Sequence, residues 1–178
     1  MEWVLQVRRA ATGRRVILAL LVAMAFNVWF FSVGPYGQMQ EHGGILDERF
    51  GDSAKDHLDS LEALGDDGRS AYRSFLFADL VYPLLQAMWM TGLLALVAKR
   101  WRAFPALLLL APAAALVSDW IENLAFLALL GQYPDTSHGV AVVAVVFQWS
   151  KLLWNAVAVL AALAFVAKLI MNPIRRRR

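Results

Sequence analysis

Residues 140–167 read VAVVAVVFQWSKLLWNAVAVLAALAFVA, and this stretch decides the class of fold. It is longer than the roughly 20 residues that an α-helix needs to cross a bilayer. Lys151 is the one charged residue within it. An apolar run of this length predicts a transmembrane helix.

Three further apolar runs of spanning length occupy about residues 16–33, 75–98 and 104–130. The chain of 178 residues is 60% hydrophobic and 17% charged, which is unusual for a soluble domain and leaves room for one membrane domain. The sequence therefore predicts an all-α polytopic membrane protein whose four transmembrane helices form an antiparallel bundle.

The orientation of the bundle is predicted from its charges. Twelve basic residues flank the runs: Arg8, Arg9, Arg14 and Arg15, then Lys99, Arg100 and Arg102, and finally Lys168 and Arg175 to Arg178. Residues 36–73 show the reverse, with nine acidic residues against four basic ones. Because Lys and Arg are retained in the cytoplasm, we expect both termini and the basic tail, 168–178, inside and segment 36–73 outside. A cleaved signal peptide is the alternative for the first run, but no A-x-A-like site follows it.

The acidic segment is expected to contain a short helix at 53–64. Ser53 or Asp52 can cap its start, and Gly65 can end it. The apolar residues Leu58, Leu61 and Leu64 would share one face. This pattern indicates an amphipathic helix on the outer membrane surface or over the mouth of the bundle. A solvated linker is the alternative.

Charged residues inside the spans are the main candidates for a functional site, because a charge in the membrane is costly. They are Asp79, Asp119, Glu122 and Lys151, and the spans also contain the amides Asn27, Gln86, Asn123, Gln148 and Asn155. At a helical rise of 1.5 Å per residue, Glu122 and Gln148 lie about 12 Å below the outer ends of their helices. Asp119 and Lys151 lie about 17 Å below them. We therefore expect one polar cluster, open toward the outside.

Helical spacing places these polar residues on common faces. Asp119 and Glu122 are three residues apart, so they share a face of one helix. A second helix carries Asp79, Tyr82 and Gln86 on one face. Pro83 has no N–H, so the carbonyl of Asp79 is expected to lose its helical partner, although an ordinary proline kink is an equal alternative.

The charge count suggests what this cluster needs. Three carboxylates face one ammonium, so we expect one carboxylate to be protonated or a further cation to be present. Arg69, Arg73, a bound cation or a cationic ligand head are the candidates. The structural alternative is that Lys151 pairs with a carboxylate only to hold helices together. Four deep tryptophans are either pocket walls or bulky packing: Trp89, Trp120, Trp149 and Trp154.

Several chemistries have no support in the sequence. There is no cysteine, and the histidines lie outside the predicted spans, so we expect neither a metal site nor a cofactor. No phosphate-binding loop or hydrolase motif occurs, and Ser118 and Ser150 have no histidine beside them in the sequence. The basic residues mark the ends of spans, so no nucleic acid is expected. We leave open whether the protein is an enzyme.

A set of short motifs gives the chain a wider resemblance. The motifs are Leu61-x-x-Leu64-Gly65-x-x-Gly68-Arg69-x-x-Tyr72, Asp79-x-x-Tyr82-Pro83, Asp119-x-x-Glu122-Asn123, Tyr133-Pro134 and Lys151. In this order they resemble a group of uncharacterised bacterial four-helix membrane proteins, from about residue 51 to residue 154. The resemblance implies the fold and a bacterial inner-membrane location, and it implies no activity.

Three functions are compatible with these features. The first is a protein that binds, or binds and processes, a lipid or amphiphilic small molecule whose head is held by the polar cluster. The second is a non-catalytic subunit of a larger membrane complex, with a structural charge network. The third is a small proton- or cation-coupled carrier, although no inverted repeat is visible. Membrane lipids are the expected partners, with a homo-oligomer or a larger complex as alternatives.

Overall fold

The structure is a computed structural model that describes residues 2–42, 51–101 and 104–175. Part of the expected external segment (43–50), Arg102 and the end of the expected tail (176–178) lie outside the described residues. Four described stretches are long and apolar enough to cross a membrane: Gly13–Glu41, Gly65–Arg100, Ala106–Gln132 and His138–Phe165. The prediction of an all-α fold with four long apolar helices packed together is confirmed.

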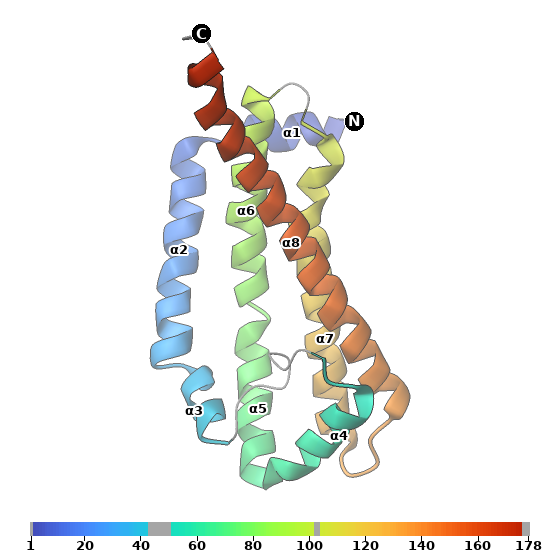
Figure 1. The fold of residues 1–178 in the computed structure, drawn as a ribbon. Helices are drawn as coiled ribbons and strands as arrows, with labels where there is room; N and C mark the ends of the chain where they lie inside the picture. Colours follow the sequence, from blue (N-terminus) through green and yellow to red (C-terminus); the bar gives the residue numbers. More distant parts are fainter. Residues whose placement is uncertain (1, 43–50, 102–103, 176–178) are drawn as a thin grey trace.

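Figure 1 shows the arrangement of the helices. In chain order they are α1 (Glu2–Ala10), α2 (Gly13–Ser32), α3 (Pro35–Glu41), α4 (Ala54–Ala63), α5 (Gly65–Asp79), α6 (Tyr82–Arg100), the 3₁₀ turn η2 (Ala106–Leu110), α7 (Ala111–Gln132) and α8 (His138–Arg175). The second apolar run is divided between α5 and α6. The fourth lies within α8, which crosses the bundle obliquely.

Local chemistry sets the ends of several helices. Thr12 caps α2, since its hydroxyl oxygen accepts the amide hydrogen of Arg15 at 3.3 Å. At the other end of α2 the amides of Val33 and Gly34 both donate to the carbonyl of Trp29. Pro35 then opens α3, a position where proline fits because the first turn needs no amide donor.

Helix α4 begins with a capping box. The amide and hydroxyl of Ser53 both donate to Asp56 Oδ2 at 2.7 Å, and the Asp56 amide donates back to the Ser53 hydroxyl oxygen. These hydrogen bonds from Ser53, first from its side chain and then from its backbone, hold the pKa of the Asp56 carboxyl below its ordinary value. Of the three leucines expected on one face, Leu61 is fully buried, and Leu58 and Leu64 pack against the same core.

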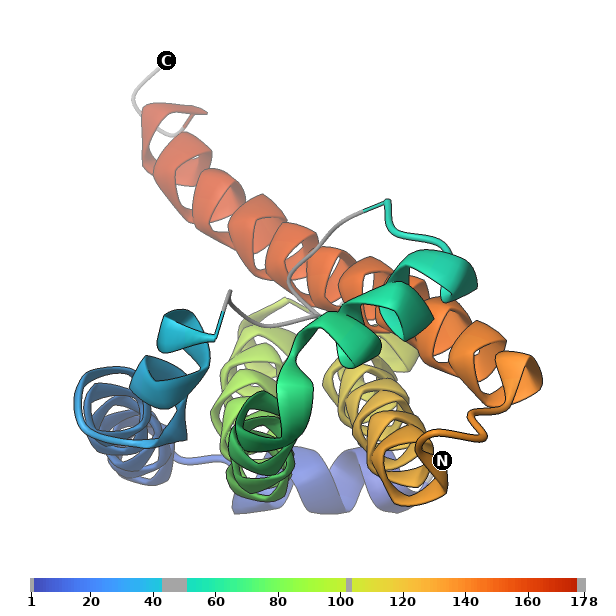
Figure 2. The same cartoon turned by 90° about the horizontal axis from the view of Figure 1, so that it is seen from below.

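Two short helices have no counterpart in the sequence-based expectations. Helix α1 lies across the ends of α6 and α7 rather than along the bundle (Figures 1 and 2). It buries Val4 in an apolar core shared with α6. Helix α3 folds back beside α5 and buries Met39. Both helices are too short to be stable alone, so they depend on these contacts.

The packed interior has three layers along the bundle axis. One apolar core includes Phe30, Tyr72, Phe75, Phe126 and Leu129, and the other includes Met90, Leu94, Val97, Leu109 and Ala158. The third layer, here called the polar layer, lies between these two cores and consists of polar residues of α5, α6, α7 and α8: Asp79, Gln86, Asp119, Glu122, Asn123, Gln148, Lys151 and Asn155. The polar cluster is therefore enclosed above and below by apolar packing.

Basic residues gather at one end of the bundle. The N-terminus, the end of α6 and the end of α8 all lie there (Figure 1). Lys99 Nζ donates to the carbonyl of Ala11, and Lys168 Nζ lies 4.2 Å from the centre of the Trp101 ring. Three basic segments that are far apart in the sequence thus share one end. That this end faces the cytoplasm stays a prediction.

Candidate functional site

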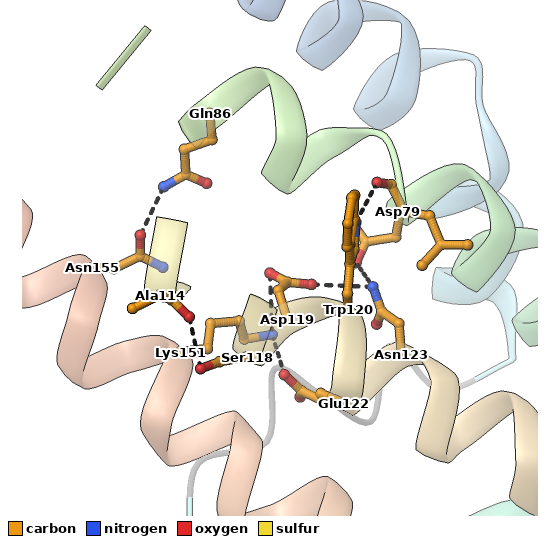
Figure 3. Close-up of polar contacts among 11 residues, drawn as sticks. Asp79, Gln86, Ala114, Ser118, Asp119, Trp120, Glu122, Asn123, Lys151 and Asn155 are labelled. Atoms are coloured by element: carbon orange, nitrogen blue, oxygen red, sulfur yellow. Dashed lines mark hydrogen bonds and ion pairs between the residues drawn. The ribbon is translucent and has the colours of Figure 1, made fainter. Parts of the chain in front are cut away.

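The centre of the polar layer is an ion pair between α7 and α8. Lys151 Nζ lies 2.7 Å from Glu122 Oε2 and 3.9 Å from Asp119 Oδ2 (Figure 3). Glu122 is completely buried, and only 13% of the Lys151 side chain is exposed. Helical spacing explains the arrangement, because residues three apart on α7 face the same neighbour.

Asn123 joins a third carboxylate to this pair. Its side-chain amide donates to Asp79 Oδ2 at 2.9 Å and to Asp119 Oδ1 at 3.1 Å. Asn123 is completely buried, and both aspartates are 6% exposed. The amide therefore separates two carboxylates and connects α5 to α7. Hydrogen bonds to charged acceptors of this kind are stronger than those between neutral groups.

Two neutral contacts lie near the ion pair, one between α7 and α8 and one between α6 and α8. The hydroxyls of Ser118 and Ser150 are 2.9 Å apart, and Ser118 also donates to the carbonyl of Ala114. On the other side, the amide nitrogen of Gln86 donates to Asn155 Oδ1 at 3.2 Å. The serine contact connects α7 to α8, and the amide contact, drawn in Figure 3, connects α8 to α6.

The junction of α5 and α6 lies beside Asp79. The helix is interrupted at Leu80 and Val81, two residues before the buried Pro83. The indole nitrogen of Trp120 donates to the carbonyl of Leu80 at 2.8 Å. A side chain of α7 therefore satisfies a carbonyl at the interruption, as the lipid environment requires. The sequence had pointed to the carbonyl of Asp79, one residue earlier.

A cavity of about 310 Å³ opens beside the polar layer. Charged and amide groups form part of its lining, here called the charged wall: Asp79, Gln86, Asp119, Lys151 and Asn155. Aromatic rings form another part, here called the aromatic wall: Phe30, Phe31 and Tyr36 from α2 and α3, and Phe75 and Tyr82 from α5 and α6. Its walls come from α2, α3, α5, α6, α7 and α8, so the complete bundle is needed to form it.

The aromatic wall is built by ring-to-ring packing. Phe30 is 2% exposed, and its ring is stacked on Tyr82 with centroids 6.3 Å apart. Phe31 meets Tyr36 edge-on with centroids 4.6 Å apart, and Phe31 is 44% exposed. The buried ring fixes the wall, while the exposed ring marks the edge where the cavity reaches the surface.

The remaining candidate residues lie at different distances from this cavity. Gln148 is buried on α8, one turn before Lys151. Asn27 lines a separate cavity of about 120 Å³ together with Tyr82, Gln86 and Trp89. Trp154 is partly exposed on α8 and does not line the cavity. Tyr82 and Gln86 belong to both cavities and separate Asn27 from the ion pair.

Arg69 and Arg73 do not approach the carboxylates in the described structure. Arg69 pairs with Asp66, donates to the carbonyl of Leu61 and lies 3.8 Å from the centre of the Tyr133 ring. Arg73 donates to the carbonyl of Leu130 at 3.2 Å. These two cations fasten α5 to the end of α7 and to the loop that follows it.

The sequence did not indicate the aromatic wall. One feature of the sequence could have indicated this wall, namely the concentration of aromatic residues near the first predicted span. Five of them fall within eleven positions: Phe26, Trp29, Phe30, Phe31 and Tyr36. The fold-back of α3 places the last of these rings against the others, and that turn could not be foreseen from periodicity alone.

The arrangement offers partners to a charged head group. Carboxylate, ammonium and amide groups line the cavity beside apolar rings, a combination that is usual in specific small-molecule sites. Within the described ranges, no group of three or more His, Asp or Glu residues is placed to hold a metal ion.

Models of known protein families, curated proteins and solved structures give no match to this chain. The resemblance to a bacterial four-helix group therefore stays a prediction, and the site has to be interpreted from its own chemistry.

Proposed function

We propose that this protein binds a lipid or another amphiphilic small molecule in the cavity beside the polar layer. The observation that carries the proposal is that one cavity is lined both by charged groups and by aromatic rings, with only rings coming from α2 and α3 and the charges Asp119 and Lys151 coming from α7 and α8. An amphiphile likewise combines a polar head with an apolar chain. Such a ligand would place its head near Asp79, Asp119 and Lys151 and its first carbons against the rings of Phe31 and Tyr36.

The charges suggest the type of head group. Two carboxylates and an ammonium line the same wall, so a zwitterionic head can meet an opposite charge at each of its own. A protonated amine of the ligand would lie near Asp79 and Asp119, and its phosphate would lie toward Lys151. Aromatic rings in the lining of the cavity add a favourable surface for an ammonium group.

The size and edge of the cavity support a ligand that enters sideways from the membrane. A volume of about 310 Å³ accommodates a head group and a short part of one chain. Phe31 is exposed at the edge, on the surface of α2. A chain could therefore continue from the cavity into the surrounding lipid without crossing the bundle.

Location and orientation complete the proposal. The resemblance to bacterial proteins favours the inner membrane. The segregation of basic residues favours cytoplasmic termini. In that orientation the cavity would open toward the outer half of the bilayer. A ligand from the outer leaflet would reach it most directly.

Binding of lysophosphatidylethanolamine to the detergent-solubilised protein tests the proposal. This probe has one chain and a zwitterionic head, and native mass spectrometry counts the molecules bound. Phe31→Ala should weaken binding several-fold, because an aromatic contact is lost at the edge of the cavity. Phe77→Ala is the matched control, since Phe77 is exposed on α5 and does not line the cavity. Equal affinities for the two variants would contradict the proposal.

A structural role for the charges is the second candidate. The 2.7 Å contact between Lys151 and Glu122 joins α7 to α8 and would suit a non-catalytic subunit of a larger complex. That candidate does not account for the aromatic wall beside the charges, and neither does a cation-coupled carrier. We therefore place ligand binding first.

A further inference from the structure

The basic end of the bundle contains a second site, separate from the polar layer. A cavity of about 470 Å³ lies between α1, α2, α6 and α7. Apart from Arg15 and Thr91 its lining is apolar, and much of it is alanine or glycine: Ala10, Ala11, Ala19, Ala87, Gly92 and Ala113. A smaller apolar cavity of about 220 Å³ adjoins it.

The two cavities share part of their lining. Arg15, Ala19 and Met88 line both of them, and Arg15 is the one charged residue among their described lining. A pair of neighbouring apolar spaces with a single cation between them matches the shape of a diacyl phospholipid. One chain would occupy each cavity, and the phosphate would lie at Arg15.

The surroundings of Arg15 add positive charge. Arg15 is exposed, and it donates one hydrogen bond to the carbonyl of Ala10 at 2.9 Å. A guanidinium carries five N–H donors in a planar fork, so it can hold this carbonyl and bind a phosphate at the same time. Lys99 donates to the neighbouring carbonyl of Ala11, and Arg14 adjoins Arg15 in the chain.

Helix α1 places this site at the level of lipid head groups. It lies across the bundle rather than along it (Figure 2), with Val4 buried against the protein. Trp3 and Leu5 are exposed on the same helix, and Arg8 and Arg9 occupy its last turn. Apolar and basic residues together on a helix in this orientation are typical of one that lies in the membrane interface.

We propose that the two apolar cavities and Arg15 form a binding site for an anionic phospholipid at the basic end of the bundle. This ligand differs from the amphiphile of the polar layer in its position and in the charge that recognises it. Basic side chains between transmembrane helices are a known means of binding anionic head groups, and Arg15 has such a position. The site would anchor α1 to the membrane and to α2.

Native mass spectrometry of the full chain tests this site with dioleoylphosphatidylglycerol and dioleoylphosphatidylcholine as probes. We expect phosphatidylglycerol to bind at least about fivefold more tightly than phosphatidylcholine, because one contact between a basic residue and the anionic head gives a difference of this size. Arg15→Gln should weaken the binding of phosphatidylglycerol about fivefold. Arg100→Gln, which removes an exposed charge at the same end of the bundle but outside both cavities, should leave it unchanged.

A second variant tests the chain-binding cavity without altering charge. Ala113→Phe adds a ring to an exposed position in the wall of the larger cavity, so it should weaken binding of both lipids. Equal binding of the two lipids by the Phe31→Ala protein, in which binding beside the polar layer is weakened, would overturn the proposal. Unchanged binding by both Arg15→Gln and Ala113→Phe would also overturn it, and would assign the lipid to another surface. Phe31→Ala should not affect phosphatidylglycerol binding, which separates this site from the polar layer.

Discussion

Lys151 holds the polar layer together at the scale of single residues. Its ammonium lies between two carboxylates of α7, at 2.7 Å from Glu122 and 3.9 Å from Asp119. A buried ion pair adds less to stability than its short distance suggests, because both charges lose their hydration. Removing one partner is far more costly, because it leaves the other charge buried.

We therefore predict that Lys151→Met destabilises the protein strongly. The free energy of unfolding in detergent should fall by about 3–5 kcal/mol, the usual cost of breaking a buried pair. Arg100→Met is the matched control, since Arg100 is exposed at the end of α6 and a solvated charge contributes little. If both variants melt at the same temperature, Lys151 does not hold the layer together.

Periodicity identified most residues of this layer, and the charge count offered the pairing of Lys151 with a carboxylate, but neither indicated the bridge through Asn123. The spacing of Asp119 and Glu122 indicated a shared face, and the structure places both near Lys151. The bridge from Asn123 to Asp79 depends on how far α5 is shifted along α7, and a single sequence does not contain that register. Asn27 has a similar depth in its span but lies on the far side of Tyr82 and Gln86.

At the scale of elements, α2 is held against α6 by a close approach at Gly92. A Cβ atom at this position would lie 2.7 Å from Val16 Cγ2. Small residues at such crossings allow transmembrane helices to pack closely. Since α2 carries Phe30 and Phe31, the position of the aromatic wall depends on this crossing.

Gly92→Ala should therefore separate α2 from α6. We expect it to lower the free energy of unfolding by about 1–3 kcal/mol, as overpacking does. Gly131→Ala is the control, because a Cβ there meets nothing within 4 Å. Thermal unfolding of the two variants in the same detergent gives the comparison, and a more stable Gly92→Ala protein would refute the close packing.

The interruption between α5 and α6 leads to a prediction about local dynamics. Trp120→Phe removes the indole donor to the carbonyl of Leu80, a hydrogen bond that contributes about 1 kcal/mol. The amides of Tyr82, Leu84, Leu85 and Gln86, which follow the interruption, should then exchange hydrogen about fivefold faster. Trp154→Phe makes the same change at a residue of equal exposure, 37%, and should leave this exchange unaltered.

The long helices could be predicted from the sequence, and the short ones could not. Apolar runs of spanning length have one stable form in lipid, so α2, α7 and α8 follow from hydropathy. Helices α1 and α3 have nine and seven residues, and their stability comes from burying Val4 and Met39 against other elements. The division of the second run into α5 and α6 was only partly indicated, by Pro83.

At the scale of the whole molecule, the distribution of charge predicts the orientation. The chain has no cysteine, so single cysteines can report on each end without a background. With the basic end in the cytoplasm, a cysteine at the exposed position of Asp67 should react with a membrane-impermeant maleimide in intact cells. A cysteine at Arg100 should react only after the cells are opened. The opposite pattern would invert the topology.

The central claim is that the cavity beside the polar layer binds the head of an amphiphile. An experimental structure with lysophosphatidylethanolamine, determined in a lipid phase, tests this claim most directly. The account predicts the head within hydrogen-bonding distance, about 3 Å, of Asp79, Asp119 or Lys151, with the chain passing the ring of Phe31. A cavity that holds only water while the ligand binds elsewhere would contradict it and would leave the charges a structural role.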